Sequence, residues 1–149
     1  MKINKAQTRT ASTESEMICI GKKIGKILKA GDVVTLDGTL GAGKTCLTKG
    51  IALGLDITET ITSPTFTIIS EYDKGRLHLY HIDVYRLECA NDFWDIGGDE
   101  MLFGTGVCII EWAEKIEEAI PEKAIKIHIE INKDGSRKLS ITNAPENLT

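Results

Sequence analysis

The residues best suited to chemistry lie between Gly38 and Thr45, where the sequence reads GTLGAGKT. This is the G-x-x-x-x-G-K-T pattern of a phosphate-binding P-loop. Its glycines let successive backbone N–H groups point at phosphate oxygens, and the helix that should follow adds the positive end of its dipole. In this pattern Lys44 reaches the β- and γ-phosphates, and the Thr45 hydroxyl holds Mg²⁺. The sequence therefore predicts a nucleotide site from Gly38 to Cys46, including Thr39, Leu40, Gly41, Ala42 and Gly43.

Two acidic residues could complete a magnesium site beside this loop. Asp83 follows the strand-like run LHLYHI, and Glu111 follows the apolar run VCII. The carboxyl ends of parallel strands gather on the ligand side of a sheet, where a carboxylate can hold the metal directly or through water. Either residue could be the direct ligand, and the sequence leaves that choice open.

Four further features have both a structural and a functional interpretation. The loop 63–65, read Ser-Pro-Thr, could respond to the γ-phosphate or be an ordinary turn. His81 should share a strand face with Asp83 and so could orient that carboxylate. Trp112 could anchor the core or cover the site, and Arg86 could contact phosphate, an acidic partner or a surface carboxylate.

The elements that must position these residues follow an α/β pattern. Thr13 and Glu16 have capping-box spacing, and apolar residues then recur at helical spacing up to a helix end predicted at Gly31. Gly54 is predicted to end the P-loop helix with a positive φ. Strands are predicted at 33–37, 66–72, 77–84, 107–111, 124–132 and 137–142, and helices at about 44–53, 91–96 and 113–120.

This order of elements predicts one α/β domain spanning residues 1–149. We expect a P-loop NTPase-like three-layer sandwich whose mixed, mainly parallel sheet includes an antiparallel hairpin. Residues 1–11 and 143–149 are expected to be loose ends of that domain, because neither segment shows a regular apolar pattern.

Composition excludes several classes of protein. The chain of 149 residues is 42% hydrophobic, which is typical of a folded globular domain. Its net charge of −4 argues against a large basic surface that grips nucleic acid directly. None of the four cysteines has C-x-x-C spacing, so free thiols are expected in place of a zinc site or disulfide framework. The N-terminus lacks a secretory signal and no apolar run approaches about 18 residues, so a cytoplasmic protein without a membrane anchor is expected.

Four segments together resemble a known family. GTLGAGKT, SPTFT, HIDVYRL and IIEW occur in this order, within a resemblance that runs from about Ser12 to about Ile131. The chain is similar to the TsaE (YjeE) family, small bacterial P-loop ATPases required to make threonylcarbamoyladenosine in tRNA. The P-loop is common to many families, whereas the other three segments are far more specific.

The resemblance implies a role for each matching residue. Lys44 would bind the β- and γ-phosphates, and Thr45 with Glu111 would hold Mg²⁺. Asp83 would support the metal or the attacking water. Thr65 would act as a nucleotide-responsive switch in the SPTFT loop.

The resemblance also extends to the surroundings of the nucleotide. Trp112 would lie beside it, and the segment around Ser12 and Thr13 would pass near the base. Two positions depart from the family pattern. Thr39 stands where the family usually has an acidic residue, and Cys46 stands where a second threonine is usual. Because Thr39 lacks the negative charge that is usual at this position, we expect the affinity for nucleotide or the rate of hydrolysis to differ from that of the family.

The partners implied by the resemblance are TsaB and TsaD. TsaD transfers the threonylcarbamoyl group, and TsaE hydrolyses ATP to keep the cycle turning, so contact with tRNA would be indirect. Slow hydrolysis by the chain alone is expected, because it contains only four arginines to stabilise transferred charge: Arg9, Arg76, Arg86 and Arg137.

Three other functions fit parts of the sequence. A small-molecule kinase usually needs a lid or several arginines, and no such insertion is present. A GTPase switch typically carries N-K-x-D, which residues 132–135 (NKDG) match only in part. A structural protein with a vestigial P-loop is disfavoured because Lys44, Thr45, Asp83 and Glu111 are all intact.

Overall fold

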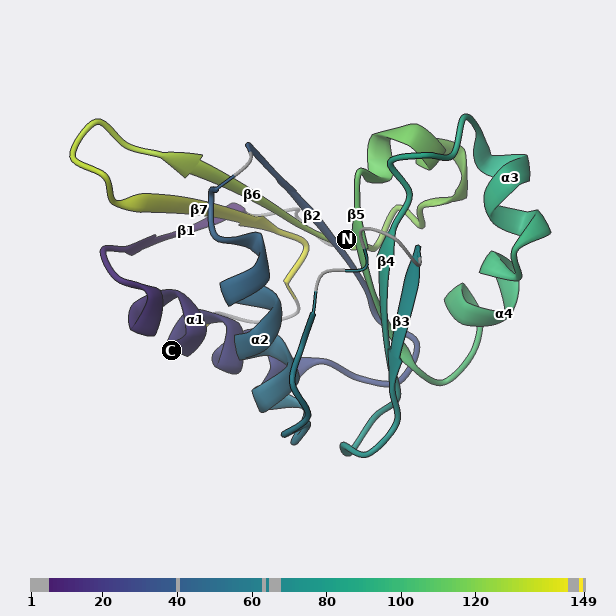
Figure 1. Ribbon diagram of the computed structural model, residues 1–149. Coiled ribbons are helices and arrows are strands. Elements are labelled where there is room, and N and C mark those ends of the chain that lie inside the picture. The colour runs from purple at the N-terminus through teal and green to yellow at the C-terminus, as the bar shows by residue number, and fades with distance from the viewer. Residues whose placement is uncertain (1–5, 40, 63, 65–67, 145–147, 149) are drawn as a thin grey trace.

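A mixed β-sheet runs through the molecule, with helices on both of its faces (Figure 1). The computed structural model describes residues 6–39, 41–62, 64, 68–144 and 148. Within that part of the chain the sheet has seven strands in the order β1-β7-β6-β2-β5-β4-β3. The strands are β1 (Ala6–Ala11), β2 (Val33–Gly38), β3 (Ile69–Tyr72), β4 (Leu79–Asp83), β5 (Val107–Glu111), β6 (Ile125–Ile131) and β7 (Arg137–Thr142). The predicted α/β fold is confirmed.

The centre of the sheet is parallel and its two sides are antiparallel. β2 pairs in parallel with both β5 and β6, and β4 pairs in parallel with β5. The register places Glu111 opposite Leu36 of β2 on one side and opposite Asp83 of β4 on the other. The carboxyl ends of β2, β4 and β5 therefore meet at one edge of the sheet, as expected for parallel strands.

Alternate residues of the central strands serve two separate cores. In β5, Ile109 packs into the core under the first pair of helices, whereas Cys108 and Ile110 pack into the core on the opposite face. A strand buried on both faces is apolar throughout, which explains the unbroken run VCII.

Helix α1 (Glu14–Ile27) begins as predicted and ends earlier than predicted. Thr13 accepts a hydrogen bond from the Glu16 backbone N–H at 3.1 Å, and the Glu16 side chain accepts from the Thr13 N–H at 3.2 Å. This capping box confirms the predicted start. The predicted end at Gly31 is wrong, because the helix stops at Ile27 and Gly31, with φ +88°, serves the turn that leads into β2.

Helix α1 crosses α2 (Lys44–Gly54) through two pairs of glycines, and the helices lie side by side in Figure 1. A Cβ at Gly50 would lie 2.2 Å from the Ile18 carbonyl oxygen, and one at Gly25 would lie 2.2 Å from the Ile51 carbonyl oxygen. The helix backbones are therefore too close for any side chain at the crossing.

The predicted positive φ at Gly54 is also wrong. Gly54 is the last residue of α2, and its Cβ position would lie 2.7 Å from the Gly25 Cα. The positive φ, 63°, belongs instead to Asp56 in the turn that follows. Gly54 is thus required for helix packing and not for the turn.

The other face of the sheet carries α3 (Ala90–Asp95), α4 (Gly98–Leu102) and the 3₁₀ helix η1 (Ala113–Ala119). The predicted short helix is confirmed as α3, and Gly97, with φ +89°, separates it from α4, which the sequence did not predict. The helix predicted at 113–120 is confirmed as η1, which is a 3₁₀ helix with a kink at Ile116. Ile116 and Ala119 are both buried, and three residues per turn places them on one face.

The expectation of loose ends is wrong for the residues that the structure describes there. Residues 6–11 form β1, which pairs with β7 over its whole length. Gln7 Oε1 accepts a hydrogen bond from the Leu148 N–H at 3.1 Å, and the Leu148 side chain is buried. Backbone hydrogen bonds to β7 hold β1 at the edge of the sheet. A polar segment can therefore form an ordered strand without a regular apolar pattern. No helix among the described residues has the length and apolar character needed to span a membrane.

Candidate functional site

The loop between β2 and α2 has the backbone of a phosphate-binding turn. Gly41 and Gly43 adopt positive φ angles of 83° and 105°, which glycine tolerates without strain. Gly43 occupies the N-cap of α2 without a side-chain hydrogen bond, whereas α1 has a complete capping box. The start of α2 can therefore offer backbone N–H groups and a positive dipole end to an anion. Leu40, predicted to belong to this site, lies outside the described residues.

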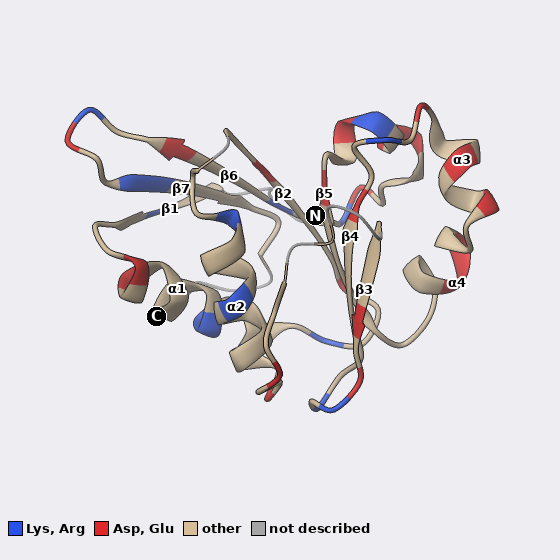
Figure 2. Cartoon of the chain, viewed as in Figure 1, with Lys and Arg blue, Asp and Glu red and all other residues tan. Residues whose placement is uncertain are grey.

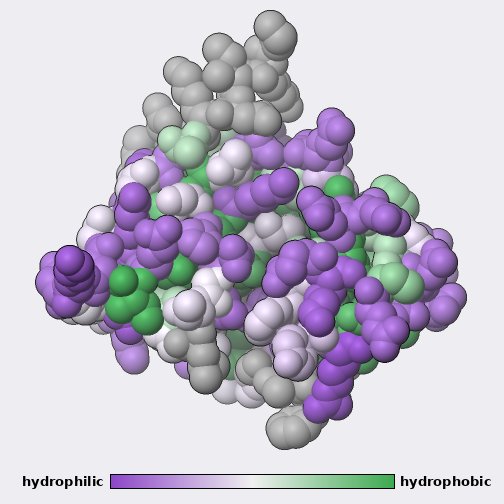
Figure 3. Space-filling view, turned by 90° about the horizontal axis from the view of Figure 1, so that it is seen from above, coloured by the Kyte–Doolittle hydropathy of each residue, from purple (hydrophilic) through white to green (hydrophobic). Residues whose placement is uncertain are grey.

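A cleft of about 630 Å³ opens beside this loop at the carboxyl edge of the sheet. It brings together the predicted Lys44, Asp83 and Glu111 from three separate segments. The described residues that line it are Gly41, Gly43, Lys44, Thr45, Cys46, Ile68, Asp83, Tyr85, Arg86, Glu111 and Trp112. Figure 3 looks down on this edge of the molecule, whose surface is mostly hydrophilic with small hydrophobic areas. The location suits a charged ligand.

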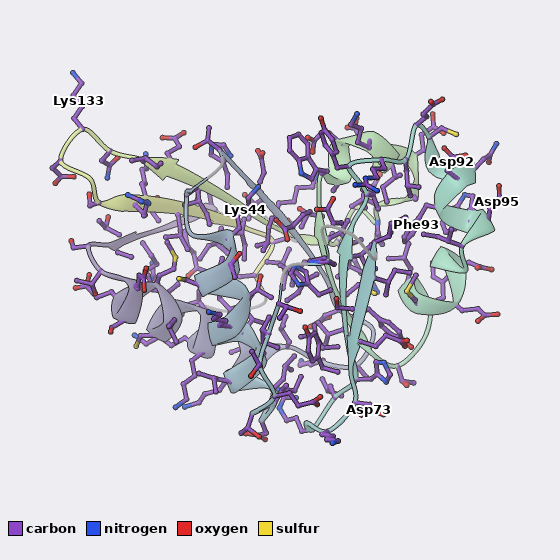
Figure 4. All side chains as sticks on the ribbon, in the orientation of Figure 1. Lys44, Asp73, Asp92, Phe93, Asp95 and Lys133 are labelled. Carbon is purple, nitrogen blue, oxygen red and sulfur yellow. The ribbon has the colours of Figure 1, made fainter. Side chains whose placement is uncertain are left out.

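Lys44 and Glu111 face each other in this cleft. Lys44 is the first residue of α2 and is labelled in Figure 4. Its Nζ lies 3.7 Å from Glu111 Oε1. The two groups form an ion pair without a close hydrogen bond, which leaves the lysine able to exchange partners.

The second oxygen of Glu111 is bound to His81. His81 Nε2 donates to Glu111 Oε2 at 2.8 Å, and both residues are buried. Burial alone would raise the pKa of Glu111, but the hydrogen bond and charge of His81, together with Lys44, lower that pKa overall. The carboxylate is therefore ionised at neutral pH. The prediction that His81 orients Asp83 is wrong, because the ring reaches diagonally across to β5.

Asp83 lies beside Glu111 and is held by its own turn. Its Oδ1 accepts a hydrogen bond from the Tyr85 backbone N–H at 2.9 Å, and its side chain is half-buried at the cleft. Asp83 and Glu111 are direct partners in the β4–β5 register. The sequence interpretation that both strands end in carboxylates on one side is confirmed.

An aromatic pair covers one wall of the cleft. The Trp112 ring centroid lies 5.6 Å from Lys44 Nζ and 4.7 Å from the Tyr85 ring. Trp112 has a left-handed backbone with φ 64° and is 38% exposed, so it covers the cleft and does not anchor a core. Sequence reasoning missed Tyr85, although it lies two residues after Asp83 within the HIDVYRL segment.

A smaller hollow of about 200 Å³ lies on the other side of the P-loop. Ser12, Thr13 and Met17 line it from the start of α1, and Gly41, Gly43 and Cys46 contribute to both hollows. Arg137, which sequence reasoning did not assign here, donates from Nη2 to the Gly41 carbonyl at 3.1 Å. The predicted Ser12 and Thr13 are thus brought next to the loop.

Two other predicted site residues, Thr39 and Ala42, do not line either hollow in the described part of the chain. Thr39 is exposed and Ala42 is buried. Thr65 lies outside the described residues, as does most of the SPTFT segment.

The stretch NKDG forms the turn of the β6–β7 hairpin. Asp134 Oδ1 accepts hydrogen bonds from the Ser136 N–H at 2.9 Å and the Ser136 hydroxyl at 2.6 Å. Lys133 projects from the tip of the hairpin (Figure 4). The carboxylate is thus engaged by its own turn, which is the interpretation expected for these residue types.

Comparisons with known proteins agree on one family. The family described as "Threonylcarbamoyl adenosine biosynthesis protein TsaE" matches residues 11–139. A protein of Treponema pallidum named tRNA threonylcarbamoyladenosine biosynthesis protein TsaE is 51% identical over 121 residues, covering 81% of this chain and 89% of that protein. The protein of the same name from Bacillus subtilis is 49% identical over 134 residues, covering 90% and 83% of the two chains. The crystal structure of YdiB from Bacillus subtilis superposes with a TM-score of 0.82 at 42% identity, over 95% of this chain and 88% of that one.

Proposed function

The chain belongs to the TsaE family, and we propose that it serves threonylcarbamoyladenosine biosynthesis in tRNA as a Mg²⁺-dependent ATPase acting with TsaB and TsaD. The observation that carries the ATPase proposal is the meeting of Lys44, Asp83 and Glu111 beside the uncapped start of α2. Binding and hydrolysis of a nucleoside triphosphate require a cationic side chain, carboxylates that can hold a metal, and backbone N–H donors in such an arrangement.

The shape of the loop fits a triphosphate. A Cβ at Gly41 would meet no atom of the described residues within 4 Å, so the space beside this residue is open. Both hollows adjoin the P-loop: the larger contains Lys44, Asp83 and Glu111, and the smaller contains Thr13, Met17 and Arg137. We assign the phosphates to the larger hollow and the nucleoside to the smaller, near Ser12 and Thr13.

The oxygen donors in the larger hollow fit Mg²⁺. No group of three or more His, Cys, Asp or Glu side chains among the described residues could hold a metal by itself. Magnesium at such sites takes one or two carboxylates and completes its shell with phosphate oxygens and water. Thr45, Asp83 and Glu111 would hold it here, and the bound ion would neutralise charge on the phosphates.

The side chains of this chain then divide the work. Lys44 exchanges its ion pair with Glu111 for the β- and γ-phosphate oxygens and stabilises the charge that develops during transfer. Asp83 supports the metal site or the water that attacks the γ-phosphorus. Trp112 and Tyr85 shield one wall of the cleft from solvent. Thr65 would respond to the γ-phosphate.

The larger hollow contains few cationic side chains that could stabilise charge during phosphoryl transfer. Arg86 is the one arginine among the described residues that line the larger hollow, and it is exposed. Charge stabilisation by arginine accelerates phosphoryl transfer strongly in related chemistry. Hydrolysis by the isolated chain should therefore be slow until partner proteins complete or reposition the site.

The surface charge favours protein partners over direct contact with tRNA. Figure 2 shows acidic bands on α3 and α4, and the sequence contains no lysine or arginine between Arg86 and Lys115. Such a surface repels a phosphate backbone. We therefore assign tRNA recognition to the partners of this chain.

The test is steady-state ATP hydrolysis by this protein alone and then with TsaB and TsaD from the same source. We expect slow turnover alone and acceleration by the partners, both abolished in Lys44→Ala. Fast turnover that does not depend on the partners would contradict the gating mechanism. No ATP turnover in either setting would contradict the ATPase assignment.

A further inference from the structure

We propose that His81 is a positioning residue that holds one oxygen of Glu111, so that this carboxylate presents only its other oxygen to the nucleotide cleft. The inference rests on the proposed function, because it concerns how Glu111 serves the site. It assigns different roles to the two oxygens of one carboxylate.

The geometry separates the two oxygens. Glu111 Oε2 accepts from His81 Nε2 at 2.8 Å, whereas Oε1 lies 3.7 Å from Lys44 Nζ. His81 and Asp83 are two residues apart on β4 and so share a face, and Glu111 is the register partner of Asp83. The imidazole therefore approaches Glu111 from deeper in the sheet, while Lys44 approaches from the cleft.

Burial makes this hydrogen bond hard to replace. The His81 side chain is 1% exposed, so water does not compete for the carboxylate at that position. A carboxylate only accepts hydrogen bonds, so Nε2 must carry the proton in either charge state of the ring. The pairing thus fixes Nε2 as the ring nitrogen that carries the proton.

The second ring nitrogen of His81, Nδ1, argues against a role for this side chain in core packing alone. His81 Nδ1 is buried and has no hydrogen-bond partner among the described residues. Burial of an unpaired polar atom destabilises a fold, and an apolar side chain at this position would avoid that cost. The contact with Glu111 is the interaction that offsets it.

The held carboxylate has a consequence for Lys44. A freely rotating Glu111 could turn both oxygens toward the ammonium and form a close ion pair that competes with phosphate. With Oε2 held by His81, the lysine remains at 3.7 Å from Oε1. We infer that His81 keeps Oε1 available for metal or its water and keeps Lys44 available for nucleotide.

The chain offers a matched control for the experiment. His78 Nε2 and Glu71 Oε1 form a similar pair at 3.2 Å, but their side chains are 34% and 58% exposed. The variants are His81→Leu, which removes the donor, His81→Gln, whose amide can still donate, and His78→Leu as the control.

The first measurement is calorimetric binding of a non-hydrolysable ATP analogue over a range of Mg²⁺ concentrations. We expect His81→Leu to raise the Mg²⁺ concentration for half-maximal binding about tenfold, as for loss of other groups that orient metal ligands. His81→Gln should restore most of that loss, and His78→Leu should not differ from the natural sequence. An unchanged Mg²⁺ dependence in His81→Leu would overturn the proposal, as would a folded His81→Gln variant that behaves like His81→Leu.

The second measurement does not depend on metal, nucleotide or the stability of the His81 variants. Long-range ¹H–¹⁵N NMR on the nucleotide-free protein reports which nitrogen of each of the three histidines is protonated. We expect the His81 signal to show a proton on Nε2 and to shift in Glu111→Gln but not in Glu71→Gln. A His81 ring signal whose chemical shift is the same in Glu111→Gln as in the unaltered protein would overturn the proposal. Failure of the unaltered protein to bind any Mg²⁺–nucleotide would contradict the proposed function, while the NMR result would still decide the role of His81.

Discussion

Lys44 at the start of α2 and Glu111 at the end of β5 stand 3.7 Å apart, joined by charge and not by a close hydrogen bond. The lysine is on the P-loop helix and the glutamate is on the sheet, so the pair spans the two walls of the cleft. The separation of 3.7 Å between the charged groups suits an ion pair that must be broken when phosphate binds. Substitution of either Lys44 or Glu111 therefore tests this ion pair.

Lys44→Ala should nearly abolish ATP hydrolysis. Loss of one preorganised donor to a transition-state oxyanion typically costs about 10²-fold in rate or more. The measurement is kcat/KM for ATP in the presence of the partner proteins. Lys49→Ala, an exposed lysine on the same helix, is the control and should retain activity. Equal activity in the two variants would remove Lys44 from the site.

Glu111→Gln should weaken the dependence of nucleotide binding on Mg²⁺. The amide keeps the size of the side chain but loses the negative charge that a hard cation requires. Titration of Mg²⁺ at a fixed concentration of a non-hydrolysable ATP analogue measures the effect. Glu114→Gln, an exposed residue three positions later, is the control. A titration identical to that of the unaltered protein would exclude Glu111 as a metal ligand.

Nucleotide should protect Cys46 from alkylation. Cys46 is partly exposed and lines both hollows beside the P-loop, so bound ATP would cover it. Cys19 and Cys89 are exposed and line neither hollow, so they serve as internal controls whose reaction rates should not change. Burial raises the pKa of the Cys108 thiol to about 12, so Cys108 should not react in the folded protein. Peptide mass spectrometry after timed alkylation distinguishes the four sites, and equal labelling of Cys46 with and without ATP would contradict the assignment.

Gly50→Ala should destabilise the fold by about 1–3 kcal/mol, the usual cost of overpacking. The added Cβ would lie 2.2 Å from the Ile18 carbonyl oxygen, which belongs to the backbone and cannot rotate away. Urea denaturation measures the free energy of unfolding. Lys49→Ala, at the preceding exposed position of α2, provides the control. A Gly50→Ala protein as stable as this control would show that the two helices can separate without cost.

Ser136→Ala should destabilise the β6–β7 hairpin more at neutral pH than in acid, where the hydrogen bond from Asn132 Nδ2 to the Ser136 hydroxyl at 2.9 Å remains. The hydroxyl and backbone N–H of Ser136 lower the pKa of Asp134 below its ordinary value. A lowered pKa in the folded state means that the ionised carboxylate stabilises the fold above its ordinary pKa. This contribution disappears as the pH falls through the folded-state pKa.

The measurement is the difference in urea midpoint between Ser136→Ala and the unaltered protein as a function of pH. The difference should shrink below the ordinary pKa range of aspartate. Ser140→Ala provides the control, because Ser140 is half-buried in the strand β7 and lies outside the turn that contains Asp134. A difference that does not vary with pH would show that the hydroxyl does not act through the charge of Asp134, and would contradict the prediction.

The sequence alone determined the features that depend on local chemistry. The glycine pattern before Lys44 requires backbone angles that other residues rarely adopt, and the structure has them at Gly41 and Gly43. The capping box at Thr13 and the carboxylates after two apolar strands also depend on short spacings. Parallel pairing then brings Asp83 and Glu111 together by a general rule of such sheets.

Only the tertiary structure decided which distant groups meet. His81 could have turned to Asp83 on its own strand, but the register and burial place it against Glu111 on the next strand. The polar strand β1 is held by backbone pairing with β7, which no apolar pattern reveals. The sequence predicts Gly54 as a helix end. The structure shows that glycine is required there because Gly25 of α1 packs against it. Each of these outcomes depends on contacts between segments far apart in sequence, whose partners are chosen by the packing of the whole sheet and its helices.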